Sequence, residues 1–282
     1  MMQGGRPTQT SVRKIADMSK IPDILKKIID SKKDEIASAK SFLAGFKSKI
    51  RDISPALDFM MALSPGEHPA IIAEIKKASP SAGIISADFD PERIAVNYFD
   101  AGCDAISVLT EKKYFLGDLA FIPAIKGKVA IPVLRKDFIV DSSQIYESRA
   151  SGADSFLLIA SALDKTALLD FINIGRGLGM EPLVEVHSEG ELETALDAGA
   201  RIIGVNSRDL RTFKVDIGVA MRLVDQIPRP LVKIAESGIR DIKTAEDLFN
   251  AGFTGFLIGE MLMRNPDETA GIVKEIIEIR RN

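Results

Sequence analysis

One pattern occurs four times in the chain: FDAGCDAISVLT (99–110), RASGADSFLLIA (149–160), LDAGARIIGVNS (196–207) and FNAGFTGFLIGE (249–260). Each copy reads as the end of an amphipathic helix, a small residue followed by glycine, and a short apolar run. Glycine is favoured just past a helix C-terminus, because it adopts the left-handed backbone that closes the last turn. Each copy has such a glycine, at Gly102, Gly152, Gly199 and Gly252. The pattern therefore predicts a repeated unit of helix, turn and strand.

Four more apolar runs fill the gaps around these copies, and turn signals bound each one. They cover residues 70–75, 129–134, 182–186 and 231–235, which brings the expected strands to eight. Near-continuous apolar strands separated by helices indicate parallel pairing with both sheet faces covered. From residue 70 onward about 26 residues fall to each unit, the size of a small eight-stranded β/α barrel. The chain is thus predicted to be an α/β protein, a parallel (β/α)8 TIM barrel.

An open, doubly wound sheet is the alternative fold. Such sheets usually carry a glycine-rich turn after the first strand. The corresponding sequence here is EIKKAS (74–79), which has no glycine. This difference favours the barrel.

The first 69 residues fall outside the repeat and predict an N-terminal helical extension. Apolar residues at three- and four-residue steps between Ile21 and Phe46 indicate an amphipathic helix. A second helix is expected to begin with Ser54 as N-cap and Pro55 as its first residue. We expect a disordered tail (1–18), a helical extension packed on the barrel (19–69) and a catalytic barrel (70–282), together forming one functional domain.

Composition and charge exclude several classes of protein. The formal net charge is −3, so no general basic field would attract nucleic acid or an anionic membrane. One cysteine cannot form an internal disulfide, and two histidines are too few for a Cys/His metal cluster. No apolar run reaches the roughly 18 residues of a membrane span, and the N-terminus lacks the apolar core of a signal peptide. We expect a cytoplasmic protein with no nucleic-acid or membrane partner.

In a β/α barrel the chemistry lies at the C-terminal ends of the strands, and polar residues end nearly every run here. Glu74 and Lys76 are two positions apart on the first run and so share one face of it. Glu185 lies between two valines in LVEVH (183–187), where a carboxylate must be paired or functional. A Glu–Lys ion pair that merely fills the barrel top is the simpler interpretation. Several such residues favour function, because ionisable groups cluster where pKa values are tuned.

The last two strands end in AESGI (235–239) and IGE (258–260). Barrels of this type often bind phosphate there, through backbone N–H groups and a helix N-terminus. Gly238 and Gly259 would let the backbone approach an anion closely, and the alternative is that both are ordinary turn residues. The two strand ends together favour a phosphorylated substrate.

Lys136 in LRKDF (134–138) is open to three interpretations: a surface lysine, a Schiff-base nucleophile or a general acid. Because His187 is the one histidine in the strand-end runs, proton transfer would fall to lysines and carboxylates. We expect burial to lower the pKa of the Lys136 ammonium towards neutrality. These features predict acid/base chemistry on a phosphorylated, carbohydrate-like substrate.

Seven motifs follow one another along the chain: AEIKKASPSAG (73–83), LTEKKYFLG (109–117), LRKDFIVDSSQIYE (134–147), LVEVH (183–187), IGVNSRDL (203–210), AESGI (235–239) and LIGEMLMR (257–264). Their order and spacing resemble the indole-3-glycerol-phosphate synthase family of tryptophan biosynthesis, over about residues 20–270. The resemblance implies a carboxy-lyase that needs no cofactor and no metal. The family converts 1-(2-carboxyphenylamino)-1-deoxyribulose 5-phosphate to indole-3-glycerol phosphate, releasing carbon dioxide and water.

The resemblance also implies roles for the strand-end residues. Lys136 would be the general acid that protonates the substrate carbonyl, Glu185 the general base, and Glu74 would support dehydration. The other implied catalytic residues are Lys76, which holds carboxylate or phosphate and later transfers a proton, Asn206, which orients the substrate, and Ser237, which binds the phosphate with Gly238 and Gly259. The implied substrate-binding residues are Arg208 and Glu236, the phosphate-binding Gly238, Gly259 and Glu260, the loop residue Ser79, and Phe115 and Phe138 as apolar walls. Plain packing is the alternative for both phenylalanines. An apolar wall would also raise the pKa of nearby carboxylates and lower that of lysines.

Three positions depart from the family pattern, and each bears on substrate affinity. Glu260 stands where some members have serine, so a phosphate contact there would use the backbone, with the acidic side chain pointing away. Ala82 follows SPS (79–81) where many members carry lysine. Leu57 stands where we expected an arginine near the phenylalanine of the second N-terminal helix.

Two other functions stay open on the sequence alone. One is a Schiff-base aldolase that uses the same lysine, and the other is a non-catalytic phosphate-ligand binder or assembly subunit. The set of Glu74, Lys76, Lys136, Glu185 and Asn206 favours an enzyme, because a binding protein needs no such set. We expect a small phosphorylated substrate and a monomer or weak oligomer, and contacts with other tryptophan-pathway enzymes are an open option.

Overall fold

The computed structural model describes residues 22–86 and 88–281. The expected disordered tail (1–18) and the first residues of the extension lie outside the described residues. Each helix in the described part of the chain is too short or too polar to cross a membrane.

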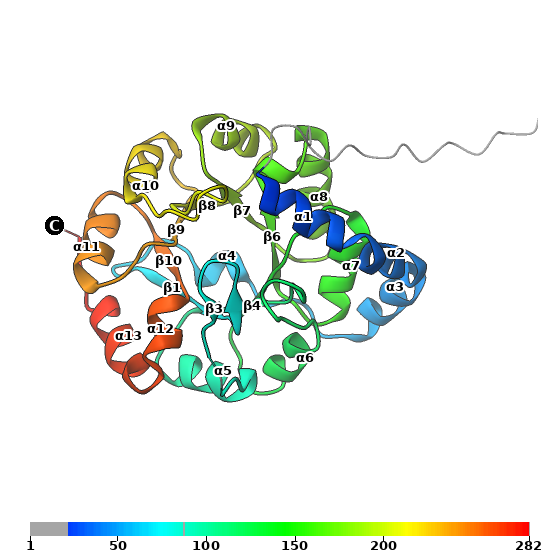
Figure 1. The fold of residues 1–282 in the computed structure, drawn as a ribbon, viewed down its shortest axis with the longest axis horizontal. Coiled ribbons are helices and arrows are strands. Elements are labelled where there is room, and N and C mark those ends of the chain that lie inside the picture. The colour runs from blue at the N-terminus through cyan, green and yellow to red at the C-terminus, as the bar shows by residue number, and fades with distance from the viewer. Residues whose placement is uncertain (1–21, 87, 282) are drawn as a thin grey trace, which may run out of the picture.

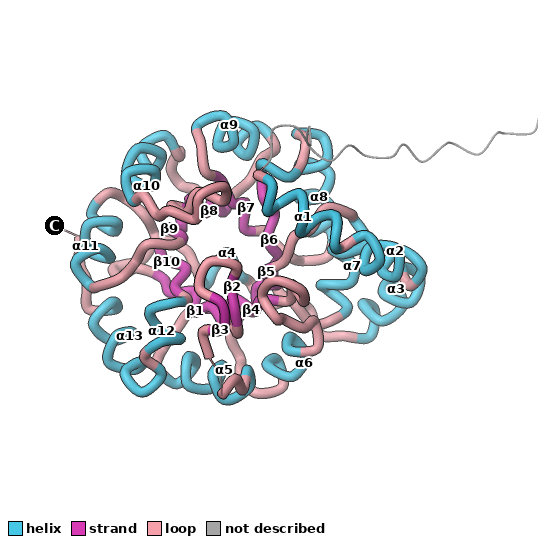
Figure 2. Tube along the Cα trace, in the orientation of Figure 1, coloured by secondary structure: helices cyan, strands magenta, loops and turns pink. Residues whose placement is uncertain are grey.

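Eight parallel strands close into a barrel, with the helices in a ring outside them (Figures 1 and 2). The strands are β1 (Ala70–Ile75), β4 (Ala105–Leu109), β5 (Val133–Lys136), β6 (Ser155–Ile159), β7 (Leu183–Val186), β8 (Ile202–Asn206), β9 (Val232–Glu236) and β10 (Gly255–Ile258). β1 pairs in parallel with both β4 and β10, so the sheet closes on itself. The predicted (β/α)8 barrel is therefore confirmed, and the open sheet is excluded.

Three strands begin later than the apolar runs that predicted them. β5 begins after Pro132 and β7 after Pro182, because proline lacks the N–H that a ladder hydrogen bond needs. β9 is shifted by one residue relative to the expected 231–235. As a result Lys136 and Glu236 are the last residues of their strands.

Helices connect successive strands and cover the outer face of the barrel (Figure 2). They are α5 (Pro91–Asp100), α6 (Phe121–Lys126), α7 (Ser142–Ala150), α8 (Lys165–Gly177), α9 (Glu189–Asp197), α10 (Ile217–Leu223) and α11 (Ile242–Asn250), with α12 (Glu260–Arg264) and α13 (Thr269–Ile277) after β10. The four repeat glycines follow α5, α7, α9 and α11 with φ between 78° and 112°, which confirms them as C-terminal glycines. Each glycine lets the chain turn back into the next strand.

The alternation of side chains along each strand decides which residues reach the barrel mouth. In β1, Ile71, Ala73 and Ile75 pack outward against the helices, whereas Ala70 and Ile72 pack in the barrel interior. The inward face of β1 therefore continues into Glu74. The same alternation turns the last inward positions of β5, β7 and β9 into Lys136, Glu185 and Glu236, all directed at the barrel axis.

The N-terminal extension differs from the single long helix that we expected. It forms α1 (Asp23–Ser31), α2 (Lys33–Ser41) and α3 (Leu43–Asp52), with breaks at Lys32 and Phe42 where ψ is 0° and 4°. The first break coincides with a lysine whose side chain is fully buried against the barrel. Leu25 and Ile29 of α1 pack with the barrel interior, so the extension covers part of the mouth.

The expected cap of the second N-terminal helix was wrong. The helix, α4 (Phe59–Ala62), begins after Asp58, whose side chain accepts a hydrogen bond from the Met61 N–H. Ser54 is not a cap. Its backbone carbonyl instead accepts a hydrogen bond from the Arg149 guanidinium on α7, which links the segment before α4 to the barrel. Phe59 packs with the interior residues of the strands and closes the barrel from the end opposite the mouth.

A two-stranded hairpin that the sequence reading missed follows β1. It consists of β2 (Ala78–Ser79) and β3 (Gly83–Ile84), paired antiparallel. The backbone N–H of Ala78 donates to the carbonyl of Phe115 at 3.2 Å, which links the hairpin to the loop after β4. The hairpin thus brings Ser79 to the rim of the mouth.

Candidate active site

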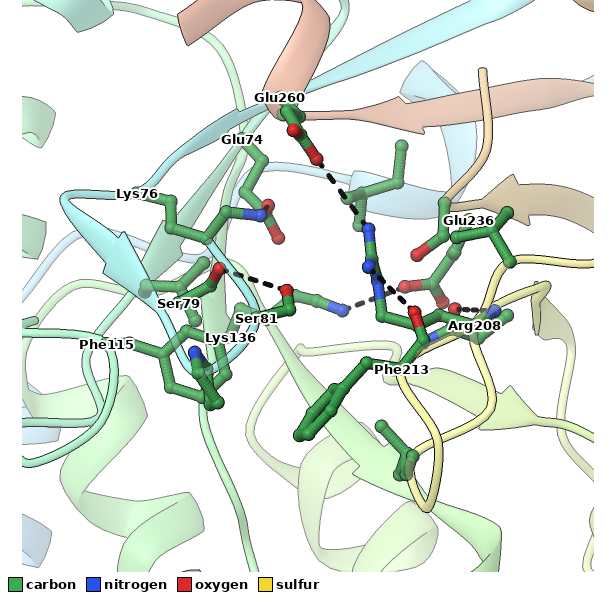
Figure 3. A pocket seen from close by; sticks show the side chains of 18 of the residues that line it. Glu74, Lys76, Ser79, Ser81, Phe115, Lys136, Arg208, Phe213, Glu236 and Glu260 are labelled. Atoms are coloured by element: carbon green, nitrogen blue, oxygen red, sulfur yellow. Dashed lines mark hydrogen bonds and ion pairs between the residues drawn. The ribbon is translucent and has the colours of Figure 1, made fainter. Parts of the chain in front are cut away.

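A cavity of about 850 Å³ opens at the C-terminal ends of the strands. The structure brings every sequence-predicted site residue to its wall: Glu74, Lys76, Ser79, Phe115, Lys136, Phe138, Glu185, Asn206, Arg208, Glu236, Ser237, Gly238, Gly259 and Glu260. In Figure 3, Glu74 and Lys76 lie on one side of the cavity and Arg208 and Glu236 on the other. Residues from six strand ends and from the loops after β1 and β4 therefore share one pocket.

Lys136 is at the centre of a buried charge cluster. Its Nζ lies 2.8 Å from Glu236 Oε2 and 3.2 Å from Glu185 Oε2. Lys76 pairs with Glu74 at the end of β1. The cluster contains three carboxylates and two ammonium groups, so it holds its own counter-charges and can move protons without exchanging ions with solvent.

The pKa of Lys136 departs from our expectation of a lowered value. Burial alone lowers the pKa of the ammonium, but the charges of Glu236, Glu185 and Glu74 outweigh burial and raise the pKa above its ordinary value. Lys136 therefore forms buried ion pairs with Glu236 and Glu185 and can also serve as the general acid. Lys136 is a charged proton donor, not a neutral amine.

The carboxylates of the cluster differ in pKa. Burial raises the pKa of Glu236 to about 7, although Lys136 opposes the shift and Glu185 adds to it. The same burial is outweighed at Glu74 by Lys76 and Lys136, and at Glu185 by Lys136 and His187, so the pKa of each lies below its ordinary value. The expectation of raised carboxylate pKa values therefore holds for Glu236 and fails for Glu74 and Glu185. The site combines ionised carboxylates with one that titrates near neutrality.

Glu236 has its second oxygen in an unusual setting. Oε1 is buried and makes no hydrogen bond within the described part of the chain. Gly204 on β8 lies against it, and a Cβ at that position would collide with the Glu236 carboxylate. This oxygen is therefore desolvated and without a hydrogen-bond donor, which fits the raised pKa of the carboxyl group.

We predict that Glu236 makes the stability of the protein depend on pH. A raised pKa means that the folded protein binds this proton more tightly than the unfolded chain, so the stabilisation is complete below about pH 4.5 and is lost as pH rises through about 7. Relative to wild type, Glu236→Gln should gain melting temperature as pH rises from 5 to about 7, and the difference should level off between pH 7 and pH 8.5. Thermal unfolding across that range measures the difference, and exposed Glu193→Gln is the control. A difference that does not change with pH would contradict the assignment.

Asn206 and Arg208 continue the site from the end of β8. The Asn206 Oδ1 accepts a hydrogen bond from the Arg208 backbone N–H at 3.0 Å, and its side chain also bonds Glu185. The Arg208 guanidinium donates to the Phe213 carbonyl at 3.3 Å and lies 3.7 Å from Glu260 Oε2 (Figure 3). Glu260, which we expected to point away from bound phosphate, lies along the cavity wall and also pairs with Arg264 at 3.0 Å.

The ends of β9 and β10 bring two glycines and a strained serine to the mouth. Ser237 has φ of 64° and Gly238 has φ of 85°, and a left-handed serine is uncommon outside functional sites. A Cβ on Gly238 would lie 2.5 Å from Ile217 Cδ1 and 2.7 Å from Val215 Cγ1, and the left-handed backbone also favours glycine there. Gly259 directly precedes α12, and a Cβ there would collide with the Glu74 carboxylate. The close packing around both positions explains why each is a glycine. Their contacts with a phosphate stay a prediction.

Apolar side chains also line the cavity, with Phe115 near Lys76 and Ser79 and Phe213 near Arg208 (Figure 3). Phe115 and Phe138 lie with their ring centroids 6.1 Å apart. Sequence reasoning also missed apolar residues outside the strands that line the cavity, among them Ile24, Leu25 and Ile28 of α1 and Phe213 and Val215 of the loop after β8. No strand ends at these residues, so the strand-end rule could not select them. The amphipathic face of residues 21–46 was the one available signal.

Fold and site together define a class: a (β/α)8-barrel enzyme that carries lysine and glutamate acid/base groups beside an apolar wall. Among the described residues, no group of three or more His, Cys, Asp or Glu side chains could hold a metal ion. A family model described as indole-3-glycerol phosphate synthase matches residues 25–275. The chain belongs to the indole-3-glycerol phosphate synthase family.

Similar curated proteins carry the same description. The relative from Acetivibrio thermocellus is 48% identical over 245 residues, which cover 86% of this chain and 94% of the relative. The relative from Chloroherpeton thalassium is 46% identical over 244 residues, or 85% and 94% of the two chains. The relative from Desulfosudis oleivorans is 43% identical over 263 residues, or 90% and 98%. Each is named indole-3-glycerol phosphate synthase.

Proposed function

We propose that the protein catalyses the ring closure of 1-(2-carboxyphenylamino)-1-deoxyribulose 5-phosphate to indole-3-glycerol phosphate, as a carboxy-lyase. Family membership and the names of the relatives support this reaction. The observation that carries the proposal is the position of Lys136: a charged donor, held by two carboxylates, inside a cavity with an apolar wall. The reaction needs a proton donor for a carbonyl oxygen next to an aromatic ring.

Substrate binding divides between the two sides of the cavity. The phosphate would lie against the backbone at Ser237, Gly238 and Gly259, which line the cavity after β9 and β10 and could offer N–H groups to an anion. The aromatic ring would lie against Phe115 and Phe138. The Lys76 ammonium and the Arg208 guanidinium would hold the carboxylate and orient the substrate hydroxyls together with Asn206.

Ring closure follows from the position of Lys136. As the aromatic carbon bonds to the carbonyl carbon, negative charge develops on the carbonyl oxygen, and the Lys136 ammonium stabilises this charge and transfers its proton. Cleavage of the bond to the carboxylate then releases carbon dioxide and returns the electron pair to the ring. Glu236, with a pKa near neutrality, lies 2.8 Å from the lysine and can return the proton to it.

Dehydration would use the ionised carboxylates. Glu185 keeps a lowered pKa and is therefore ionised at neutral pH, as a general base must be when it removes a proton from the closed ring. The Lys76 ammonium, held by the ionised Glu74 carboxylate at the end of β1, would protonate the departing hydroxyl so that it leaves as water. The small phosphorylated partner follows from this reaction, whereas oligomeric state, contacts with pathway enzymes and cytoplasmic location stay predictions.

A product assay tests the proposed function. Purified protein supplied with the carboxyphenylamino-deoxyribulose phosphate should produce indole absorbance and fluorescence. Binding of the substrate without product would instead support a non-catalytic binder. A covalent adduct trapped by borohydride would support a Schiff-base aldolase, which the raised pKa of Lys136 disfavours because an imine forms from the neutral amine.

A further inference from the structure

A buried ion pair joins the N-terminal extension to the strand that carries Lys136. Lys32, at the break between α1 and α2, places its Nζ 2.9 Å from Asp137 Oδ1, and neither side chain is exposed to solvent. The same ammonium also pairs with Glu35 at 2.8 Å. Asp137 is the residue next to Lys136, just past the end of β5. Lys32 does not line the cavity. It contacts Lys136 only indirectly, through the neighbouring residue Asp137.

Asp137 is held rigidly by its remaining partners. Its Oδ2 accepts hydrogen bonds from Thr110 Oγ1 at 2.7 Å and from Arg135 Nη2 at 3.0 Å. Its Oδ1, shared with Lys32, accepts the Phe138 backbone N–H at 2.8 Å. Burial would raise the pKa of Asp137, but Arg135 and Lys32 outweigh it and lower the pKa to about 2. Lys32 thus completes a set of donors that holds the Asp137 carboxylate against the Phe138 backbone and the Thr110 and Arg135 side chains.

Stability alone gives a poor reason for this pair. Removing two charges from water costs several kcal/mol per ion, and buried ion pairs are often no more stabilising than apolar residues of similar volume. Asp137 already has a cationic partner in Arg135, which it shares with Glu147, so Lys32 is the second buried cation on this carboxylate. The geometric effect of Lys32 is specific, because it ties the extension to the turn that aims Lys136 and Phe138 into the cavity.

We propose that Lys32 is a positioning residue for Lys136, acting through Asp137 and the backbone that joins the two. It would hold the end of β5 in the orientation that directs the Lys136 ammonium towards the substrate carbonyl. It would also hold α1, whose Ile24 and Ile28 line the same cavity, at a fixed distance from that ammonium. This role rests on the proposed ring closure and adds a residue of the extension to its machinery.

Lys32→Met tests the role, since methionine keeps the length of the side chain and removes the charge. Displacement of an acid by a fraction of an ångström is expected to lower kcat by about 10- to 100-fold, with a smaller change in KM. Lys33→Met is the matched control, because the neighbouring lysine is 73% exposed and pairs with Asp30 at the surface. Wild-type kcat in Lys32→Met would overturn the proposal, whereas an inactive wild-type protein would overturn the proposed function instead.

A double-mutant cycle separates positioning from general stabilisation. If Lys32 acts through Asp137, the Lys32→Met and Asp137→Asn effects on kcat should not multiply, and the double variant should be no slower than the slower single variant. Effects that multiply would show that the two residues act independently and would overturn the proposal. The double variant removes both buried charges, so it stays informative if Lys32→Met alone does not fold. Recovery of melting temperature and kcat together in the double variant would also overturn it, since fold stability would then explain the loss.

Discussion

Lys136→Met should lower kcat by at least about 1,000-fold, within the range that a positioned general acid contributes. Methionine keeps the length of the side chain but donates no proton and carries no charge to meet the developing oxyanion. The Glu236 and Glu185 carboxylates, 2.8 and 3.2 Å from the ammonium, also lose their counter-charge. Indole fluorescence measures turnover, and titration with the product measures binding, which should fall less than kcat.

The matched control is Lys128→Met. This lysine is 52% exposed and pairs with Glu92 at 3.4 Å on the outer surface, so its loss should leave kcat unchanged. An unchanged rate in Lys136→Met would remove Lys136 from the mechanism. A drop in both variants would indicate a general loss of folded protein, which circular dichroism would reveal.

The barrel could be predicted because the residues that define each helix–turn–strand unit are close together in the sequence. A glycine after a helix and an apolar run after the glycine depend on backbone conformation and burial within one unit, and four such units recur. The N-terminal region was predicted less well, since its helix limits depend on distant partners. The backbone leaves helical geometry at Lys32, whose side chain pairs with Asp137, and the Ser54 carbonyl accepts a hydrogen bond from Arg149.

The site could be predicted wherever a strand ends in it. Parallel strands bring their carboxyl ends to one face, so polar residues there converge however far apart they lie in the chain. Ile24 and Ile28 follow no such rule, because α1 reaches the cavity only through the packing of the extension. The direction of the Lys136 pKa shift could not be predicted from the sequence either. Burial lowers this pKa and three carboxylates raise it, and which effect is larger depends on distances of a few ångströms.

Glu185→Gln should lower kcat by about 100- to 1,000-fold, because the amide keeps the shape of the carboxylate but cannot accept a proton as a base. The variant retains its place beside Asn206, and Lys136 keeps Glu236 as its ionic partner. The local environment explains why this glutamate, and not Glu236, is suited to the task at neutral pH. His187 Nε2 lies 3.4 Å from Glu185 Oε1, and both this imidazole and Lys136 favour the ionised form.

The pH dependence of kcat distinguishes a base from a merely structural carboxylate. Since the pKa of Glu185 lies below its ordinary value, wild-type kcat limited by this base should fall only when pH drops below the usual range of glutamate titration. The residual activity of Glu185→Gln should lack that acidic fall, and exposed Glu189→Gln on α9 should reproduce the wild-type profile. A Glu185→Gln profile that keeps the acidic fall at wild-type rates would assign the base to another carboxylate of the cluster.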